Sequence, residues 1–125
     1  MIVKSKNLPV VGWLLIGIGV VHNALGVSAG WPLLVAAASD GLVGAWGGRG
    51  GVYWFLVTGF ALMLTGGAVA SLERYEPRLP WAWIAGLAAL TLAGVVTLPR
   101  SGFWTLLVPL TVAVVRRLRT RAPTR

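Results

Sequence analysis

The chain has 125 residues, of which 57% are hydrophobic and 11% are charged, and its formal net charge is +8. It contains no cysteine, which excludes disulfides, thiolate nucleophiles, iron–sulfur clusters and thiolate metal sites. One histidine and three carboxylates, of which Glu73 and Glu76 are expected on the opposite side of the membrane from His22, cannot supply the three or four ligands of a zinc centre, so we expect neither a metal nor another cofactor. A chain this short and apolar is predicted to form a single all-α transmembrane domain over residues 1–125.

Four long apolar runs predict four membrane spans. About 20 apolar residues in a helix, at about 1.5 Å per residue, cross a hydrocarbon core of about 30 Å. The predicted spans cover residues 8–27, 52–72, 80–98 and 102–116. The fold class expected from them is an integral membrane four-helix bundle. The last span is short, and Pro109 near its middle is expected to bend it.

The segment 31–46 is apolar enough to resemble a fifth span, but it has only 16 residues and contains Asp40. Charge distinguishes the two topologies. Four spans place nine of the eleven cations on one side of the membrane, whereas five spans place seven there. The positive-inside rule therefore favours four spans in the cytoplasmic membrane, with both termini cytoplasmic. Residues 31–46 are then expected to form a short extra helix on the outward side, interfacial or re-entrant, with Pro32 in its first turn.

The basic tail over residues 116–125 carries five of the eleven cations directly after a span. We expect it to set the topology and to contact anionic lipid headgroups rather than nucleic acid. At the same end, Glu73 and Glu76 lie near Arg74 and Arg78 and are expected to form exposed ion pairs. Tryptophan and tyrosine side chains prefer the membrane interfaces. They are expected at the outer interface at Trp31, Trp46, Trp54 and Trp104, and at the inner one at Trp13, Tyr75, Trp81 and Trp83.

Small residues recur on one face of three spans. Gly12, Gly19 and Gly26 repeat every seven residues in the first span. The other two seams consist of Gly59, Gly66 and Ala70, and of Ala82, Gly86, Ala89 and Ala93. Small side chains allow helices in a membrane to approach closely. We expect these faces to hold the bundle together, and the alternative is that one of them forms the interface of a homo-oligomer.

His22 is the only ionisable residue inside a predicted span, which makes it a candidate functional residue. If Asp40 lies over the mouth of the bundle, its carboxylate can pair with the imidazole, so His22 and Asp40 are the candidate catalytic residues. The alternative is structural: His22 bonds to a backbone carbonyl or to a threonine, and Asp40 caps a helix. The candidate ligand-binding residues share the outward side and are Asn23, Trp46, Arg49, Trp54, Arg100, Ser101 and Trp104.

Several short motifs resemble those of known small membrane proteins. They are Gly19-Val20-Val21-His22-Asn23-Ala24-Leu25-Gly26, Asp40-Gly41-Leu42, Tyr53-Trp54-Phe55-Leu56 with Gly59, Leu79-Pro80, and Pro99-Arg100-Ser101-Gly102-Phe103-Trp104. Together they resemble a group of small bacterial four-span proteins that form a domain-of-unknown-function family, and they are broadly similar to the DoxX-like membrane proteins. The resemblance covers nearly the whole chain. It implies the four-span architecture and a common location for His22, Asp40 and the turn 99–104, and it carries no established active site.

Two other four-span families of this size fit the sequence less well. Small multidrug exporters rely on a carboxylate in their first span, and this chain has none there. Fluoride channels with dual topology need a weak charge bias, unlike the bias of nine against two in this chain.

Three functions remain open. The first is a non-catalytic membrane protein that binds a lipophilic molecule, such as an isoprenoid or a quinone, or a partner membrane protein through an outward-side pocket near His22 and Asp40. The second is a small membrane enzyme, an isomerase or cyclase, that uses these two residues as general acid and base on a lipid-soluble substrate. The third is a small transporter. In each case the lipid bilayer is the expected partner.

Overall fold

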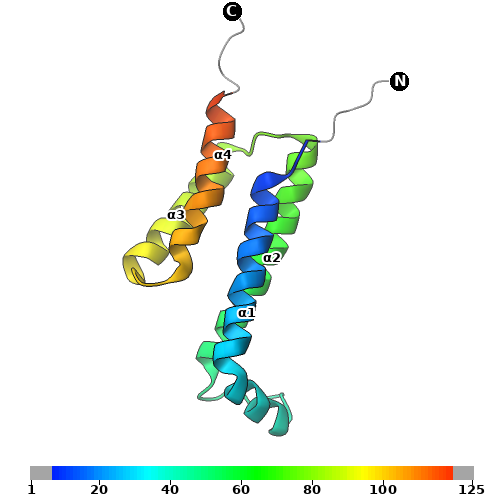
Figure 1. The fold of residues 1–125 in the computed structure, drawn as a ribbon, viewed down its shortest axis with the longest axis vertical. Coiled ribbons are helices and arrows are strands. Elements are labelled where there is room, and N and C mark those ends of the chain that lie inside the picture. Colours follow the sequence, from blue (N-terminus) through cyan, green and yellow to red (C-terminus); the bar gives the residue numbers. More distant parts are fainter. Residues whose placement is uncertain (1–6, 120–125) are drawn as a thin grey trace, which may run out of the picture.

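The computed structural model describes residues 7–119, and every regular element in this range is helical (Figure 1). The elements are α1 (Val10–Ser39), α2 (Gly50–Tyr75), α3 (Trp81–Thr97), the 3-10 helix η1 (Gly102–Leu106) and α4 (Leu107–Arg119). They form two antiparallel hairpins, α1–α2 and α3–α4, as Figure 1 shows. Within the described residues the hairpins meet through α1, which contacts η1 and α4, while α2 packs directly on neither α3 nor α4.

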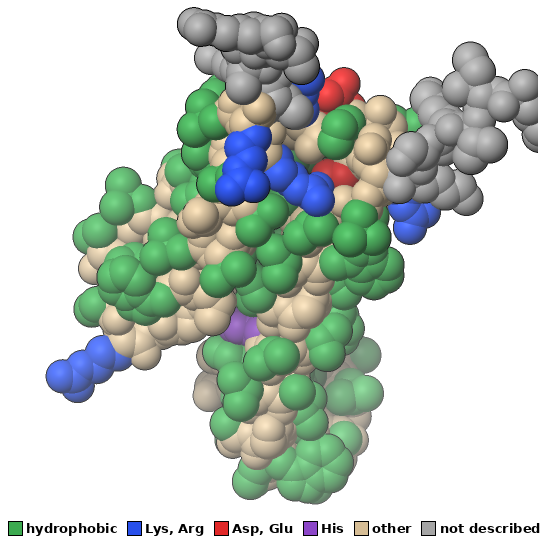
Figure 2. Space-filling model, turned by 45° about the horizontal axis from the view of Figure 1, so that its top comes forward, with side chains coloured by type: hydrophobic (Ala, Val, Ile, Leu, Met, Phe, Trp, Pro, Cys, Tyr) green, Lys and Arg blue, Asp and Glu red, His purple; other side chains and the backbone are tan. Residues whose placement is uncertain are grey.

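The two hairpins differ in length, which gives the molecule two unlike ends. α1 and α2 have 30 and 26 residues, whereas α3 and α4 have 17 and 13. In Figure 1 the shorter hairpin lies beside the part of α1–α2 where α1 begins and α2 ends. We call this the basic end, because it carries Arg74, Arg78, Arg116, Arg117 and Arg119. The far end is the turn between α1 and α2. Figure 2 shows arginine side chains gathered at the basic end of a mainly hydrophobic surface.

Two helices, α1 and α2, are long and apolar enough to cross a membrane, and α3 is a shorter apolar helix. The all-α class predicted from the sequence is confirmed over the described residues. The helices match the predicted apolar runs to within three residues, except that α1 extends to Ser39 and the fourth run is divided between η1 and α4. Four of the basic residues predicted on the cytoplasmic side lie outside the described residues: Lys4, Lys6, Arg121 and Arg125.

The predicted extra helix over residues 31–46 is not a separate element. α1 instead continues through Pro32 and ends at Ser39. Proline removes one backbone donor and tends to kink a helix. Residues 33–38, however, are mostly leucine and alanine, which favour a helix. The helix ends only where Gly41, with a φ angle of 93°, turns the chain.

Pro109 lies in the first turn of α4 and not in the middle of a continuous span, so the bend expected there does not interrupt a helix. The residues before it, 102–106, form η1, and Ser101 caps this short helix by accepting a hydrogen bond from Phe103 N. In the first turn of a helix, proline has no intrahelical hydrogen bond to lose. Pro109 therefore marks the start of α4.

The glycine seam of α1 is confirmed as a packing face. Gly12, Gly19 and Gly26 are buried. A Cβ atom on Gly19 would lie 2.7 Å from Gly59 O of α2, and one on Gly66 would lie 2.7 Å from Gly12 O. The backbones of α1 and α2 therefore approach so closely that any side chain at these positions would push them apart.

The small residues of α3 do not form the predicted packing face. All four are exposed: Ala82, Gly86, Ala89 and Ala93. α3 is buried instead at Ile84, Thr91 and Gly94, and Phe103 of η1 contacts Gly94. Within the described residues the backbone of α3 comes close only to η1 and α4, so its small-residue face meets no neighbouring helix backbone.

A small apolar core joins the two hairpins at the basic end. Its buried members are Val11, Leu15, Val69, Leu79, Ile84, Leu106 and Ala113. These residues come from all four helices, from η1 and from the α2–α3 loop. The core therefore fixes the position of the shorter hairpin against α1 and α2.

Candidate functional site

Glu73, in the last turn of α2, has a fully buried side chain. Its carboxylate oxygens accept hydrogen bonds from the backbone N–H groups of Val11 (3.2 Å) and Gly12 (2.8 Å). These groups belong to the first turn of α1, where backbone donors lack intrahelical partners, and the N-cap residue Pro9 supplies no side-chain bond. The helix dipole also favours a negative charge at this position. Glu73 therefore caps α1 from a neighbouring helix.

Arg116 of α4 completes this contact. Its Nη1 atom lies 3.1 Å from Glu73 Oε1 and also donates a hydrogen bond of 3.1 Å to Leu8 O. The Arg116 side chain is 32% exposed, so the ion pair joins a buried carboxylate to a cation at the surface. One carboxylate thus holds α1, α2 and α4 together at the basic end.

The expectation of exposed ion pairs at this end is wrong for Glu73. Glu76 is exposed and forms no ion pair within residues 7–119. The signal that distinguishes the two glutamates is spacing, because Glu73 follows Gly59 and Gly66 at seven-residue intervals. Residues seven apart share a helix face, so the glycine seam of α2 already placed Glu73 toward α1.

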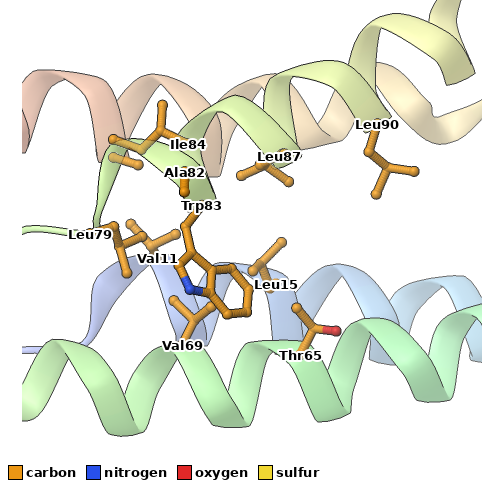
Figure 3. Close-up of a pocket in the computed structure, with 12 residues that line it drawn as sticks. Val11, Leu15, Thr65, Val69, Leu79, Ala82, Trp83, Ile84, Leu87 and Leu90 are labelled. Carbon is orange, nitrogen blue, oxygen red and sulfur yellow. The ribbon is translucent and has the colours of Figure 1, made fainter.

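An apolar cleft of about 330 Å³ lies at the basic end, between α2 and α3. Figure 3 shows the side chains that line it converging from α1, α2 and α3. The lining residues are Val11, Leu15, Thr65, Val69, Leu79, Ala82, Trp83, Ile84, Gly86, Leu87, Leu90 and Ala113. The cleft exists because α2 and α3 do not pack on each other directly. We call it the α2–α3 cleft.

Two polar groups line the otherwise apolar α2–α3 cleft. They are the Thr65 hydroxyl and the Trp83 indole N–H, both drawn in Figure 3, and neither has a hydrogen-bond partner among the described residues. In other threonines of the helices, the hydroxyl donates a hydrogen bond to the backbone carbonyl four residues earlier. Those threonines are Thr58, Thr91 and Thr97. Thr65 and Trp83 therefore keep hydrogen-bonding capacity that a ligand can use.

Gly86 adds room on the α3 side of the cleft. It lines the cleft, and a Cβ atom built on it would meet no atom within 4 Å. No titratable side chain is among the lining residues. The α2–α3 cleft is thus suited to binding an apolar molecule and offers no group for acid–base chemistry.

His22 lies against α2, part of the way along α1. Its Nε2 atom is 3.0 Å from Phe55 O, and its ring stacks on the Phe55 ring with centroids 3.7 Å apart. The hydrogen bond between His22 and the Phe55 carbonyl is the contact that we expected if His22 has a structural role. The side chain of Asn23 fills the space that a Cβ atom on Gly59 would need, and both of its polar atoms are buried without a partner in the described part of the chain. Both residues join α1 to α2.

Asp40 lies at the far end and pairs with Arg49. The distance from Arg49 Nη1 to Asp40 Oδ2 is 2.8 Å, and the same Nη1 donates to Ala45 O at 2.7 Å. The Asp40 side chain is 54% exposed. Asp40 follows His22 by 18 residues along one continuous helix, which corresponds to about 27 Å. The structure therefore does not bring the two candidate catalytic residues together.

The candidate aromatic residues of the far end gather around Tyr53. The ring centroids of Trp46 and of Trp54 each lie 5.3 Å from that of Tyr53. An open pocket of about 300 Å³ lies nearby on the α1–α2 hairpin. It is lined by Leu25, Gly26, Ala29, Gly30, Gly51, Val52 and Phe55. None of the candidate site residues lines this pocket.

The remaining candidate residues build the turn between α3 and α4. Ser101 Oγ donates to Leu98 O at 2.6 Å, and Trp104 Nε1 donates to Pro99 O at 2.8 Å. Arg100 is exposed. These bonds are local, and no candidate residue lines either the α2–α3 cleft or the pocket on the α1–α2 hairpin. Among residues 7–119, no group of three or more histidine, aspartate or glutamate side chains is placed to hold a metal ion.

Residues 6–120 match the model of a family of unknown function, DUF6463. The chain belongs to this family. The predicted membership of a domain-of-unknown-function family is therefore confirmed, while the likeness to DoxX-like proteins stays a prediction. No curated protein and no solved structure matches the chain.

Proposed function

We propose that this member of DUF6463 is an integral membrane protein that binds a lipophilic molecule in the α2–α3 cleft. The observation that carries the proposal is the cleft itself, about 330 Å³ of apolar space with two polar groups left unpaired among the described residues, on Thr65 and Trp83. Sites for small lipophilic ligands combine apolar walls with a few polar groups, in volumes of about 300–1,000 Å³. A lipid-soluble molecule with a long apolar chain and a polar head has matching chemistry.

The proposed topology has four spans and both termini on the cytoplasmic side. Counted from Val10 and Tyr75 at the basic end, Trp31 and Trp54 each lie 21 residues away, or about 31 Å along their helices. This length matches the thickness of a hydrocarbon core, and tryptophans prefer its interfaces. In this frame the basic end faces the cytoplasm, and the last turns of α1 project on the outer side with Asp40.

The shorter hairpin fits the same frame. α3 has 17 residues, and η1 with α4 extends from Gly102 to Arg119. Arginine side chains in the last turn of α4 can extend to the interface and compensate for a short span. Trp104, in η1, then lies on the same side of the membrane as Trp31 and Trp54.

A ligand can enter the α2–α3 cleft from the bilayer. Because α2 and α3 do not pack on each other directly, the cleft has an open side between them. In the proposed topology this side faces lipid, where apolar molecules are concentrated. The Thr65 hydroxyl and the Trp83 indole N–H would orient a polar group of the ligand.

A catalytic function has less support. General acid–base catalysis needs a proton-transfer group within hydrogen-bond reach of the substrate, and no titratable side chain lines the α2–α3 cleft. His22 bonds to Phe55 O, and Asp40 lies about 27 Å further along α1. Binding without chemistry, as in a carrier or an accessory subunit, is therefore the function that the geometry favours.

The proposal is tested by native mass spectrometry of protein extracted gently in detergent. Gly86→Leu fills the cleft, and Gly17→Leu is the matched control, because both positions are helix interiors where a Cβ atom meets no atom within 4 Å. We expect a small-molecule adduct on the wild type and on Gly17→Leu, and its loss from Gly86→Leu. A wild-type spectrum without any retained small molecule, or equal retention by both variants, would contradict the proposal.

The topology is tested by cysteine labelling, since the chain has no cysteine of its own. Ser39→Cys lies at the far end, and Tyr75→Cys lies at the basic end with an exposed side chain in the parent protein. In spheroplasts, a membrane-impermeant maleimide should label Ser39→Cys and leave Tyr75→Cys unlabelled until the membrane is opened. Labelling of both sites, or the reverse pattern, would overturn the proposed orientation.

A further inference from the structure

Two arginines of the basic end, Arg78 and Arg117, belong to segments that line the α2–α3 cleft. Arg78 directly precedes the lining residue Leu79 in the α2–α3 loop. Arg117 follows the lining residue Ala113 by one turn of α4. The guanidinium carbon of Arg117 lies 5.9 Å from the ring centroid of Trp81, the residue before Ala82 of the lining. An apolar cleft and a cationic rim therefore adjoin.

The charge of this rim is not balanced by the described carboxylates. The basic end carries five arginines and two glutamates between residues 73 and 119. Glu73 is buried and already engaged by Arg116 and by the first turn of α1. Arg78 is exposed and has no ion pair or hydrogen bond within residues 7–119. Its guanidinium is free to hold an anion, and arginine binds phosphate with two parallel hydrogen bonds.

We infer that the ligand of the α2–α3 cleft is a membrane lipid with a phosphate headgroup, whose phosphate binds Arg78 and Arg117 and whose chain lies along α3. The inference rests on the proposed function and specifies its ligand. It follows from charge complementarity at the rim combined with the apolar lining below it.

The depth of the cleft agrees with one lipid leaflet. Along α3 the lining extends from Ala82 to Leu90, eight residues or about 12 Å. One leaflet contributes about half of a hydrocarbon core of about 30 Å. In the proposed topology the arginines lie at the cytoplasmic interface, at the depth of the headgroups and on the side where anionic lipids attract basic residues. The polar ester groups below the phosphate would then enter the cleft, where the Trp83 indole N–H and the Thr65 hydroxyl can orient them.

The test compares two lipids that differ only in the headgroup. Phosphatidylglycerol and diacylglycerol with identical chains are titrated against delipidated protein in detergent, and the bound fraction is read by native mass spectrometry. We expect phosphatidylglycerol to bind the wild type about tenfold more tightly, and this preference to fall below about threefold in Arg78→Gln and in the Arg78→Gln/Arg117→Gln double variant. Arg100→Gln is the matched control, since it removes an exposed arginine of the α3–α4 turn, and it should keep the full preference.

The outcomes separate the inference from the proposed function. If both lipids bind equally and Gly86→Leu abolishes both, the cleft binds lipids but the phosphate inference is wrong. If neither lipid binds the wild type, the proposed function fails as well. A preference for phosphatidylglycerol that survives in the Arg78→Gln single variant would overturn the inference even if the double variant fails to fold. Displacement of the lipid by millimolar inorganic phosphate would also overturn it, because the site would then recognise a free anion.

Discussion

Among the described residues, each end of the molecule has an ion pair between a carboxylate and an arginine. The two pairs have the same chemistry but differ in burial. At the far end, Asp40 and Arg49 approach to 2.8 Å, but the Asp40 side chain is 54% exposed. At the basic end, Glu73 and Arg116 lie 3.1 Å apart, and the Glu73 side chain is completely buried. Exposed pairs contribute little because water and salt screen them, whereas a buried carboxylate must keep every partner it has. Burial therefore decides which pair matters, and the shorter distance does not.

The same contrast holds for the two pockets. The α2–α3 cleft is lined by residues of all four helices and includes the polar groups of Thr65 and Trp83, which have no partner among the described residues. The pocket near the far end lies on the wall of one hairpin and is lined by glycine, alanine, aliphatic residues and Phe55. The candidate functional residues predicted from the sequence lie mainly outside the basic end. The α2–α3 cleft, in contrast, lies at the basic end. Four predictions test this contrast, in order of expected effect.

The largest effect is expected for Glu73→Ala. The variant removes a buried carboxylate, leaves two backbone donors of the first turn of α1 without a partner and separates Arg116 from its ion pair. Breaking such a buried pair costs about 3–5 kcal/mol. Thermal unfolding in detergent, followed by tryptophan fluorescence, should show this loss. The exposed Glu76→Ala should stay within about 0.5 kcal/mol of the parent, and equal losses in both variants would refute the role of Glu73.

Gly19→Leu should also destabilise the protein strongly. A Cβ atom at this position would lie 2.7 Å from Gly59 O, so a leucine must push α1 and α2 apart. Overpacking of this kind costs about 1–3 kcal/mol or more. Gly17→Leu, whose Cβ atom meets no atom within 4 Å, is the control in the same helix. Unchanged gel filtration and unchanged thermal stability of Gly19→Leu would show that close packing at the glycine seam does not stabilise the α1–α2 hairpin.

His22→Ala is expected to have a moderate effect on stability and none on ligand binding. It removes the hydrogen bond to Phe55 O and the ring stack, and a hydrogen bond of this type contributes about 1 kcal/mol. Retention of the small molecule in native mass spectra should be unaltered, because His22 does not line the α2–α3 cleft. If His22→Ala instead lost the ligand while its stability was unaltered, His22 would be part of the ligand-binding site.

Asp40→Asn should have the smallest effect. The Asp40–Arg49 pair is exposed, and such pairs contribute between 0 and about 1 kcal/mol. The difference in thermal unfolding temperature between the parent and Asp40→Asn should be small and should shrink further at high salt, because salt screens exposed pairs. A loss as large as that of Glu73→Ala would remove the distinction between the two ends.

The sequence predicts the helices well, because long apolar runs and glycine spacing depend on local pattern. The seam of Gly12, Gly19 and Gly26 is read directly from a seven-residue repeat and reappears as a close contact between α1 and α2. The extension of α1 through Pro32 is harder to predict, because one unfavourable proline competes with six following helix-forming residues. Propensity alone does not rank these two effects reliably.

The candidate site is harder to predict than the fold, because it depends on which helices are neighbours. The sequence made His22 and Asp40 the candidates, because they are the only ionisable side chains between residues 7 and 48. Whether they meet depends on where α1 ends, which the apolar pattern does not define. The α2–α3 cleft consists of common apolar residues around a pair of helices that do not touch. The seven-residue spacing from Gly66 to Glu73 is the sequence signal that points to the basic end.

The most direct test of the central claim, that the α2–α3 cleft holds a lipid, is photo-crosslinking in vesicles. The purified protein is illuminated in the presence of a phospholipid with a diazirine on its acyl chain, and the cross-linked peptides are identified by mass spectrometry. The account predicts adducts concentrated on cleft residues such as Thr65, Trp83 and Leu87, reduced by excess unlabelled phospholipid and lost in Gly86→Leu. Adducts spread evenly over the exposed faces of all helices, and unchanged in Gly86→Leu, would contradict it.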